Sequence, residues 1–379
     1  MSTRSTGLPA NVFTADQLLL LRTVIAPTPD TMATFVAWAE QIPVERLDRG
    51  SRRMVPLLDH LLDADHPWRA TADADRQRNL AGDQRRRRTT AAMASVLRTV
   101  GIEPLVFKGV ALVAAGVLDA ELRAMADIDA AVRIDQFVLA QDTLIAAGWT
   151  IDHRVDPTRP AGSKHALTAT GPDGDTVDLH WNVLHHRSES ANRMIWNGSQ
   201  ELTIDGVTVR VPATHDNLLI ACVHRFGWKR VPPLQWVVDA TAIIAEADEA
   251  FWRSFVDHVD TQHLSLPVCD ALALLVDFGV TVPGWVVPHL SSRPRPRWTN
   301  LEFRLATAPA DPRLRLSREF RLLWLTHRTR HETSLARSLV AFPRFLASRQ
   351  RRLPLHRLVW TWLRRQSPDE ALGRQPRRG

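Results

Sequence analysis

Two aspartates stand one residue apart in a short strand-like run near the middle of the chain. Asp127 and Asp129 flank Ile128, and the run continues to Val132. Side chains alternate between the two faces of a β-strand, so both carboxylates point the same way, about 6.6 Å apart along the backbone. Like charges held this close indicate a bound cation or a shared proton.

A third aspartate has a similar setting further along the chain. In the run 177–181, the apolar residues Val177, Leu179 and Trp181 are expected to face a core, which leaves Asp178 and His180 on the other face. Three carboxylates on neighbouring strands suit a magnesium site that handles phosphates. Plainer interpretations stay open, because Asp178 could simply face solvent and Asp127 could cap a turn.

The composition is that of an ordinary globular protein. The chain has 379 residues, of which 45% are hydrophobic, and it contains no 18-residue apolar run free of charge. Its first residues lack the apolar stretch of a secretory signal, and Cys222 and Cys269 are too few for a disulfide scaffold. We therefore expect a cytoplasmic protein with no transmembrane segment and two buried thiols.

The formal net charge of +7 comes almost entirely from arginine. Lysine occurs only as Lys108, Lys164 and Lys229, and tyrosine is absent. So strong a bias toward arginine indicates a GC-rich gene more than nucleic-acid binding, although a basic surface still attracts anions. The scarcity of lysine draws attention to Lys108, which lies next to the candidate site.

Changes in hydrophobic periodicity divide the chain into four regions. The predicted regions are an N-terminal helical region (1–100), an α/β core (101–212), a helical domain (213–290) and an Arg-rich C-terminal helical region with a disordered tail (291–379). In the first region, a helix that opens with Arg85–Arg88 is expected to run to about residue 100. This basic run is expected to form a solvated helix face, with a nucleic-acid contact as the alternative.

The α/β core has clear strand, helix and turn signals. Strands are predicted at 104–107 and 128–132, with a helix from Gly109 to Leu118 between them. Asp135 is predicted to cap a helix that ends at Gly148 and buries Val138, Leu139, Leu144 and Ile145. Two hairpins are expected, one turning through 171–174 and one through Asp205 and Gly206.

These motifs occur together in a known family. The runs that carry the likeness are Phe107-Lys108-Gly109-Val110-Ala111-Leu112, Arg123 followed by Asp127-Ile128-Asp129, and Val177-Asp178-Leu179-His180-Trp181. In this order they resemble the LKG-A, R-x-x-D-I-D and V-D-L-H-W motifs of the uncharacterised bacterial nucleotidyltransferase family of the polymerase-β-like superfamily. The likeness covers roughly residues 90–245, because the stretch from His224 to Asp239 is also similar to that family's helical segment.

The resemblance implies an α+β fold, with a small mixed β-sheet and flanking N-terminal and C-terminal helical regions. It also implies transfer of a nucleoside monophosphate from an NTP such as ATP to a hydroxyl acceptor, which the sequence does not identify. By analogy, Asp127 and Asp129 bind two Mg²⁺ ions, which Mn²⁺ can replace, and Asp178 completes the second metal site. Two cations about 3.5–4 Å apart stabilise the attacking and leaving oxygens.

Lys108, Gly109, Arg123 and His180 complete the nucleotide site that the resemblance implies. Gly109 opens a helix whose backbone would receive phosphates, while Lys108 and Arg123 would add positive charge. Many superfamily members carry Gly-Ser where this chain has Lys108-Gly109. Lys108 could instead pair with one of the acids, Arg123 could be an ordinary surface residue, and His180 is expected to support the site rather than to bind metal.

Two other functions stay open. The altered Gly-Ser position favours a catalytically inactive nucleotide-binding or scaffold protein with the same fold. The Arg85–Arg88 run and the Arg-rich C-terminus favour a transferase that acts on RNA ends. His185 and His186 lack the partners of a zinc motif, Trp181 and Trp236 are expected in the core, and His224 and Asp239 are expected to make polar contacts between helices.

Overall fold

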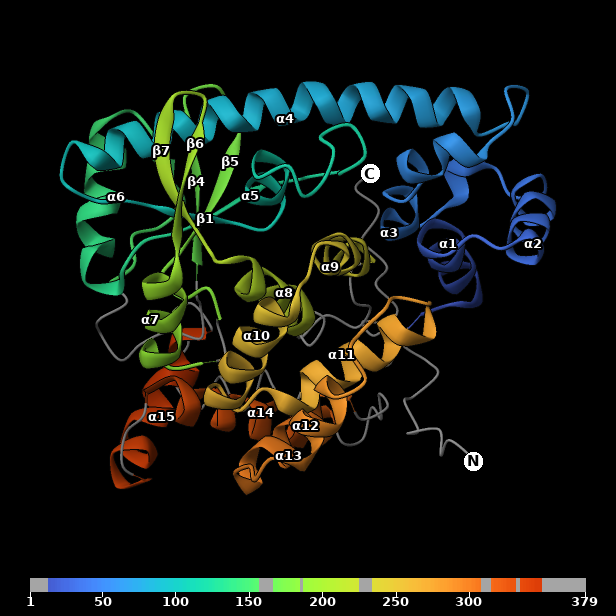
Figure 1. Cartoon of the computed structure of the whole chain (residues 1–379). Coiled ribbons are helices and arrows are strands. Elements are labelled where there is room, and N and C mark those ends of the chain that lie inside the picture. Colours follow the sequence, from blue (N-terminus) through green and yellow to red (C-terminus); the bar gives the residue numbers. More distant parts are fainter. Residues whose placement is uncertain are drawn as a thin grey trace, which may run out of the picture.

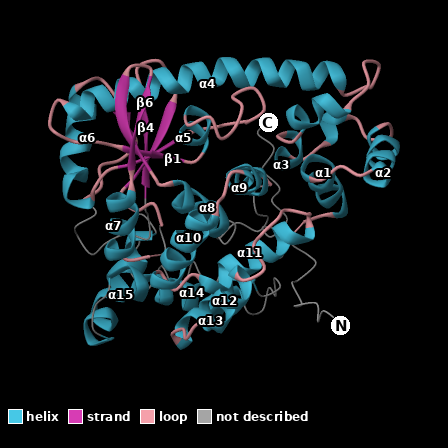
Figure 2. Cartoon of the chain, viewed as in Figure 1, coloured by secondary structure: helices cyan, strands magenta, loops and turns pink. Residues whose placement is uncertain are grey.

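A computed structural model describes residues 13–156, 166–184, 187–224, 234–307, 315–331 and 335–349. Helices surround one seven-stranded mixed sheet (Figure 1). The strands gather in one corner of the molecule, and the remainder of the described chain is helical (Figure 2). The predicted α+β fold, with a mixed sheet flanked by helical regions, is confirmed.

The sheet has the strand order β3-β4-β5-β2-β1-β7-β6. The strands are β1 (Leu105–Phe107), β2 (Ile128–Ala131), β3 (Thr150–Ile151), β4 (Ala166–Thr170), β5 (Thr176–His180), β6 (Gln200–Ile204) and β7 (Val207–Val211). β2 pairs with β5 and β1 with β7 in parallel, and the other neighbours are antiparallel. Both predicted hairpins are confirmed. Asp205 and Gly206 have φ values of 46° and 80°, the positive pair that a tight hairpin turn requires.

Helices make up the rest of the described chain. They are α1 (Ala15–Ile25), α2 (Pro29–Ala39), α3 (Arg49–Arg52), α4 (Arg69–Arg98), α5 (Gly109–Ala114), α6 (Phe137–Ala146), α7 (Glu189–Gly198), α8 (Thr214–His224), α9 (Gln235–Ala245), α10 (Glu249–Thr261), α11 (Ser265–Asp277), α12 (Val286–Ser292), α13 (Arg297–Thr307), α14 (Arg315–His331) and α15 (Leu335–Arg349), with 3₁₀ turns η1 (Val44–Arg46), η2 (Val55–Leu61) and η3 (Ile134–Gln136). Across the described segments, every helix is too short or too polar to cross a bilayer.

Alternate residues of the central strands enter two different cores. Val106, Ile128 and Ala130 pack beneath α4 and α6, together with Val177, Leu179 and Trp181 of the neighbouring strand, as their spacing predicted. Leu105, Phe107 and Ala131 face the other way and pack with residues of α8 and α9. Asp129 is two residues from Ala131, so its side chain belongs to the face that looks toward the helical region.

The longest helix links the N-terminal region to the sheet. α4 spans 30 residues, which is about 45 Å, and runs from the N-terminal helices across the sheet (Figure 1). The prediction of a helix beginning near Arg85 was wrong, since α4 begins at Arg69. Its first half lacks apolar periodicity because small or polar side chains such as Ala72, Gly82 and Asp83 occupy the buried positions.

Two helices of the sheet unit differ from their predicted extents. α5 ends at Ala114 instead of Leu118, because the chain turns at Gly116 with a φ of 74°. α6 begins at Phe137 after a 3₁₀ turn, and Val138 and Leu139 are 40% and 49% exposed.

The prediction was right for Leu144, which is buried on α6 together with Phe137 and Ala140. The division into four regions stays a prediction. One hydrophobic core runs across its boundaries, from Leu21 and Met54 through Phe107 to Leu218 and Trp236.

Candidate active site

The sheet brings two of the predicted aspartates together. β2 and β5 run parallel, and their register pairs Asp129 directly with Asp178. Neighbouring strands lie about 4.8 Å apart, so the two carboxylates are adjacent on one face. Asp127 immediately precedes β2 and is exposed. The strand register, which the sequence alone does not specify, therefore creates a cluster of acids at one end of the sheet.

Asp129 is held between two basic side chains. Lys108 Nζ donates to Asp129 Oδ1 at 2.6 Å, and His180 Nε2 shares a hydrogen bond with the same oxygen at 3.1 Å. Burial alone would raise the pKa of Asp129, but the Lys108 ammonium and His180 hold it well below its usual range. Asp129 is therefore a permanent anion near neutral pH. Its Oδ2 makes no hydrogen bond within the described part of the chain, so it is open to a cation.

Asp178 has the opposite electrostatic character. Its Oδ1 accepts a hydrogen bond from Thr168 Oγ1 at 3.0 Å. Burial raises the pKa of Asp178, and the charges of Asp129 and Asp127 add to that rise against the effect of the Thr168 hydrogen bond. Two adjacent carboxylates thus differ, because Asp129 is stabilised as an anion while Asp178 is inclined to take up a proton or a cation.

The turn that carries Lys108 is strained. Lys108 joins β1 to α5 with φ 58° and ψ −137°, a combination that glycine adopts far more readily than a residue with a Cβ. Such strain costs about 1–3 kcal/mol and is concentrated at functional sites. At the next position, a Cβ on Gly109 would lie 2.7 Å from Met125 Sδ, so any larger residue would force the Met125 side chain to move.

Arg123 is buried and engaged with another part of the protein. Its Nε and Nη2 donate to the two carboxylate oxygens of Asp239 at 2.7 and 2.9 Å, and Nη1 donates to the carbonyl of Ala124 at 2.6 Å. The alternative of an ordinary surface arginine is therefore wrong. Asp239 does make a polar contact, as expected, but it joins α9 to the segment before β2 instead of joining two helices.

Two arginines that the sequence did not single out lie near the acids. Arg53 follows α3 and Arg86 lies in α4; both are half-buried, and neither makes a side-chain hydrogen bond or ion pair with the described residues. Burial and the nearby guanidiniums of Arg49 and Arg123 lower the pKa of Arg53, whereas Asp127 raises it. Burial also lowers the pKa of Arg86, and the charges of Asp175, Asp127 and Asp83 oppose this, that of Asp175 most strongly.

The charge of Asp127 therefore acts on both guanidiniums, although neither forms an ion pair with it in the described chain. Arg86 belongs to the basic run Arg85–Arg88, but nothing in that run marks it apart from its neighbours. Arg85 lies 4.0 Å from Asp175 and Arg87 lies 3.3 Å from Asp205, so these two are paired with the sheet's own turns. Arg86 is included in the candidate site because α4 crosses the sheet and brings it under the influence of Asp127.

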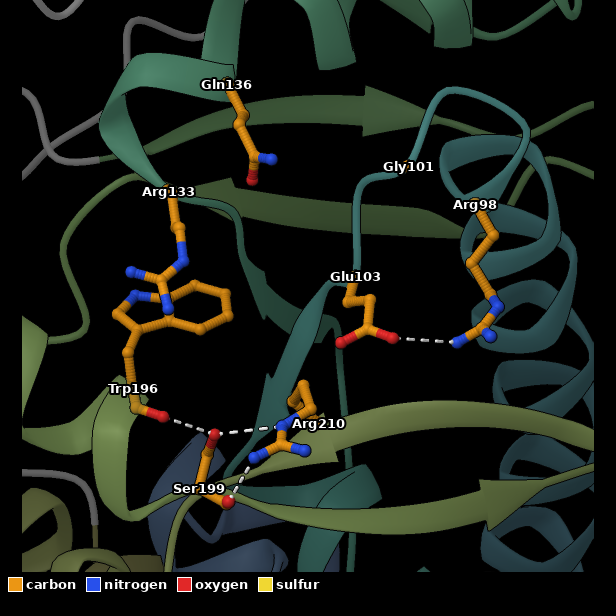
Figure 3. Close-up of a pocket in the computed structure, with 8 residues that line it drawn as sticks. All are labelled: Arg98, Gly101, Glu103, Arg133, Gln136, Trp196, Ser199 and Arg210. Carbon is orange, nitrogen blue, oxygen red and sulfur yellow. Dashed lines mark hydrogen bonds and ion pairs between the residues drawn. The ribbon is translucent and has the colours of Figure 1, made fainter.

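A basic cavity of about 340 Å³ lies at the opposite end of β1 and β2 (Figure 3). Arg133 lies over the Trp196 ring at 5.1 Å, Arg98 pairs with Glu103 and Arg210 with Ser199 (Figure 3). Arg133 is four residues beyond Asp129, about 13 Å along an extended chain. The cavity is therefore separate from the acid cluster. His185, His186 and the run 225–227 lie outside the described residues.

The comparison with protein families agrees with the site. Residues 54–278, more than half of the chain, match the model of a family described as uncharacterised nucleotidyltransferase. The chain belongs to this nucleotidyltransferase family. The matched range starts directly after Arg53 and includes Lys108, Arg123 and the three aspartates of the site.

Similarity to individual proteins is slight. No curated protein sequence matches the chain. A crystal structure of an antigenic nucleotidyltransferase-like protein from Paracoccidioides brasiliensis is similar over 56% of this chain and 95% of its own, with 14% identity and a TM-score of 0.36. A likeness this distant says nothing about the ligands or activity of the present protein.

The strained turn gives a prediction that compares two substitutions of Lys108. Both Lys108→Ala and Lys108→Gly remove the ammonium, but only glycine relieves the backbone strain. We expect the glycine variant to be more stable than the alanine variant by about 0.5–2 kcal/mol, after allowing for the greater unfolded-state entropy of glycine. Urea unfolding followed by tryptophan fluorescence measures this difference. Equal stability, or a more stable alanine variant, would show that the turn is unstrained.

The unequal carboxylates predict stability changes of opposite sign in metal-free protein. Asp129→Asn removes a charged hydrogen-bond acceptor from Lys108, and we expect it to cost about 1.5–3 kcal/mol. Asp178→Asn removes repulsion between adjacent like charges, and we expect a gain of about 0.2–1 kcal/mol at pH 7.

The gain from Asp178→Asn has a predicted pH dependence. A raised pKa means that the folded protein keeps a proton that the unfolded chain loses above about pH 4, so ionisation of Asp178 lowers stability as pH rises. The gain should therefore shrink at pH 4, as measured by urea unfolding in chelator. A loss of stability in both variants would contradict the assignment.

Proposed function

We propose that this protein is a magnesium-dependent nucleotidyltransferase, which transfers a nucleoside monophosphate from an NTP to a hydroxyl-bearing acceptor. The observation that carries the proposal is the register pairing of Asp129 with Asp178, with the exposed Asp127 two residues before Asp129. Like charges held next to each other on a buried sheet repel and destabilise the folded protein. A bound divalent cation neutralises that repulsion.

The donor set fits magnesium. Mg²⁺ prefers carboxylate and phosphate oxygens, and Asp127, Asp129 and Asp178 would hold it here. When bound, magnesium supplies positive charge to the attacking and leaving oxygens of phosphoryl transfer. The free Oδ2 of Asp129, the raised pKa of Asp178 and the exposure of Asp127 support this assignment.

The chain's own residues have distinct roles in this proposal. Asp178 lies beside Asp129 on the same face and would orient or deprotonate the acceptor hydroxyl. Lys108 lies where its ammonium neutralises either Asp129 or a phosphate oxygen, and His180 orients Asp129. Arg53 and Arg86 bind the phosphate oxygens, which the negatively charged aspartates would repel.

Arg123 acts by positioning. Its guanidinium carbon would be 3.7 Å from a Cβ on Gly109, and its pairing with Asp239 fixes α9 beside the strained turn. The Arg123 guanidinium and the Gly109 backbone amide would also contact phosphate oxygens. No residue of the described chain identifies the acceptor.

Transfer of label from α-³²P NTPs to acceptors in a cell lysate, with Mg²⁺ present, tests the activity. We expect Asp129→Asn and Asp178→Asn to reduce transfer by roughly 100-fold or more. Arg53→Ala and Arg86→Ala should each lose a charged phosphate contact worth about 1.5–3 kcal/mol, which is roughly 10–100-fold in kcat/KM for the NTP.

Arg133→Ala is the matched control for the two arginine variants. Arg133 is an exposed arginine of the same sheet, but it lies over Trp196 at the opposite end. It should leave transfer unchanged. Transfer that persists in both aspartate variants would exclude the acids from the mechanism, and arginine variants that behave like Arg133→Ala would exclude a phosphate role for Arg53 and Arg86.

A second candidate function is a catalytically inactive nucleotide-binding protein. The observation that favours it is the double engagement of Asp129 Oδ1 by Lys108 and His180, which already neutralises the acid. Calorimetry separates the two functions, because the inactive protein would bind NTP without transferring label to any acceptor. The RNA-end alternative receives no such support, since Arg85 and Arg87 pair with acids of the sheet's own turns.

A further inference from the structure

A second group of metal-ligand side chains lies in the helical region, away from the acid cluster. His215 and Asp216 are in the first turn of α8, and His258 is near the end of α10. Each offers one ligand atom, and these atoms all lie within 4.8 Å of one another. The segments that contribute them are 42 residues apart in the sequence, so packing of α8 against α10 assembles the group.

The carboxylate at the centre of this group is incompletely satisfied. Asp216 is fully buried; its Oδ1 is bonded to His258 Nδ1 at 2.7 Å. Its Oδ2 and the Nε2 of His215 are both buried, and neither has a hydrogen-bond partner. A buried polar atom without a partner costs about 1–3 kcal/mol, and here two such atoms lie 3.9 Å apart.

A hydrogen bond between these two atoms does not explain their placement. At 3.9 Å they are beyond hydrogen-bond distance. A zinc ion can lie between the two atoms after a small side-chain shift, because Zn–N and Zn–O bonds of about 2.0–2.2 Å together span about 4 Å. Two imidazoles and one carboxylate form a donor set typical of zinc with an open fourth position, and unlike an all-carboxylate set it disfavours magnesium.

We infer that His215, Asp216 and His258 form a binding site for a zinc-class transition-metal ion that joins α8 to α10. The two histidines are 20% and 23% exposed at the side chain, so the ion can enter from one side and keep a water ligand there. The site is separate from the proposed nucleotidyl transfer and does not depend on it.

Zinc titration of the purified full chain tests the inference. After chelator treatment, the protein is titrated with ZnCl₂ by calorimetry, in excess Mg²⁺ so that the oxygen-rich acid cluster does not take up zinc. We expect one zinc ion per chain and a rise in Tm of at least ~3 °C at saturation. Co²⁺ should give the intense visible absorption of a four-coordinate ion.

His215→Ala is the decisive variant. The Nε2 of His215 makes no hydrogen bond, so the substitution removes no such bond from the folded protein. It should weaken zinc binding by more than roughly 100-fold, since even loss of an outer partner of a ligand costs about 10–100-fold. Asp216→Asn and His258→Ala should do the same. His289→Ala is the matched control, because His289 is also a helical histidine beside an aspartate, 3.5 Å from Asp260, and should leave zinc binding unchanged.

The alternative is a histidine–carboxylate contact that only holds two helices together. In that case zinc would not bind at micromolar concentration, or would bind equally to wild type and to His215→Ala. Either result overturns the inference. Zinc binding that disappears with Asp129→Asn but persists in His215→Ala would assign the ion to the acid cluster and would also overturn it.

Discussion

The repulsion between adjacent carboxylates is the constraint around which this site is built. Pairing β2 with β5 in parallel places Asp129 and Asp178 next to each other, and no backbone interaction compensates their charges. Basic side chains from separate segments of the chain offset this negative charge. Lys108 comes from the turn after β1, whereas Arg53 follows α3 and Arg86 lies in α4, both of which precede the sheet in sequence. In the proposed function, the acids would hold the metal and the basic groups would contact the polyphosphate.

This arrangement explains why a strained residue and a buried ion pair are retained at the same place. Lys108 has to leave β1 in an unfavourable conformation to direct its ammonium at Asp129. The segment after α5 then returns through Arg123, which is locked to Asp239 of α9. A buried pair of this kind contributes little net stability but fixes geometry, because removing either partner leaves an uncompensated charge. The helical region therefore contacts the segment beside the strained turn as well as covering the sheet.

The sequence predicted the local features of the fold and much of the site. Period-two alternation identified the core-facing residues Val177, Leu179 and Trp181, and turn chemistry identified both hairpins, because these signals depend on neighbouring residues. It placed the start of α4 wrongly, since the buried positions there are small or polar, and chose an exposed stripe for α6 at Val138 and Leu139.

What the sequence could not predict depended on contacts between distant segments. The pairing of Asp129 with Asp178 requires the strand register, and the partner of Arg123 lies 116 residues away. In the sequence, Arg53 and Arg86 are two among many arginines; the packing of the segment after α3 and the course of α4 bring them under the influence of Asp127. The group at His215, Asp216 and His258 has no sequence motif, because its third member comes from another helix.

A crystal structure with Mn²⁺ and a non-hydrolysable NTP tests the central claim most directly. The account predicts anomalous scattering from manganese between Asp127, Asp129 and Asp178, with the triphosphate extending toward Arg53 and Arg86. It would be contradicted by a structure in which Lys108 still donates to Asp129, no manganese lies near the acids, and the nucleotide is absent or bound elsewhere.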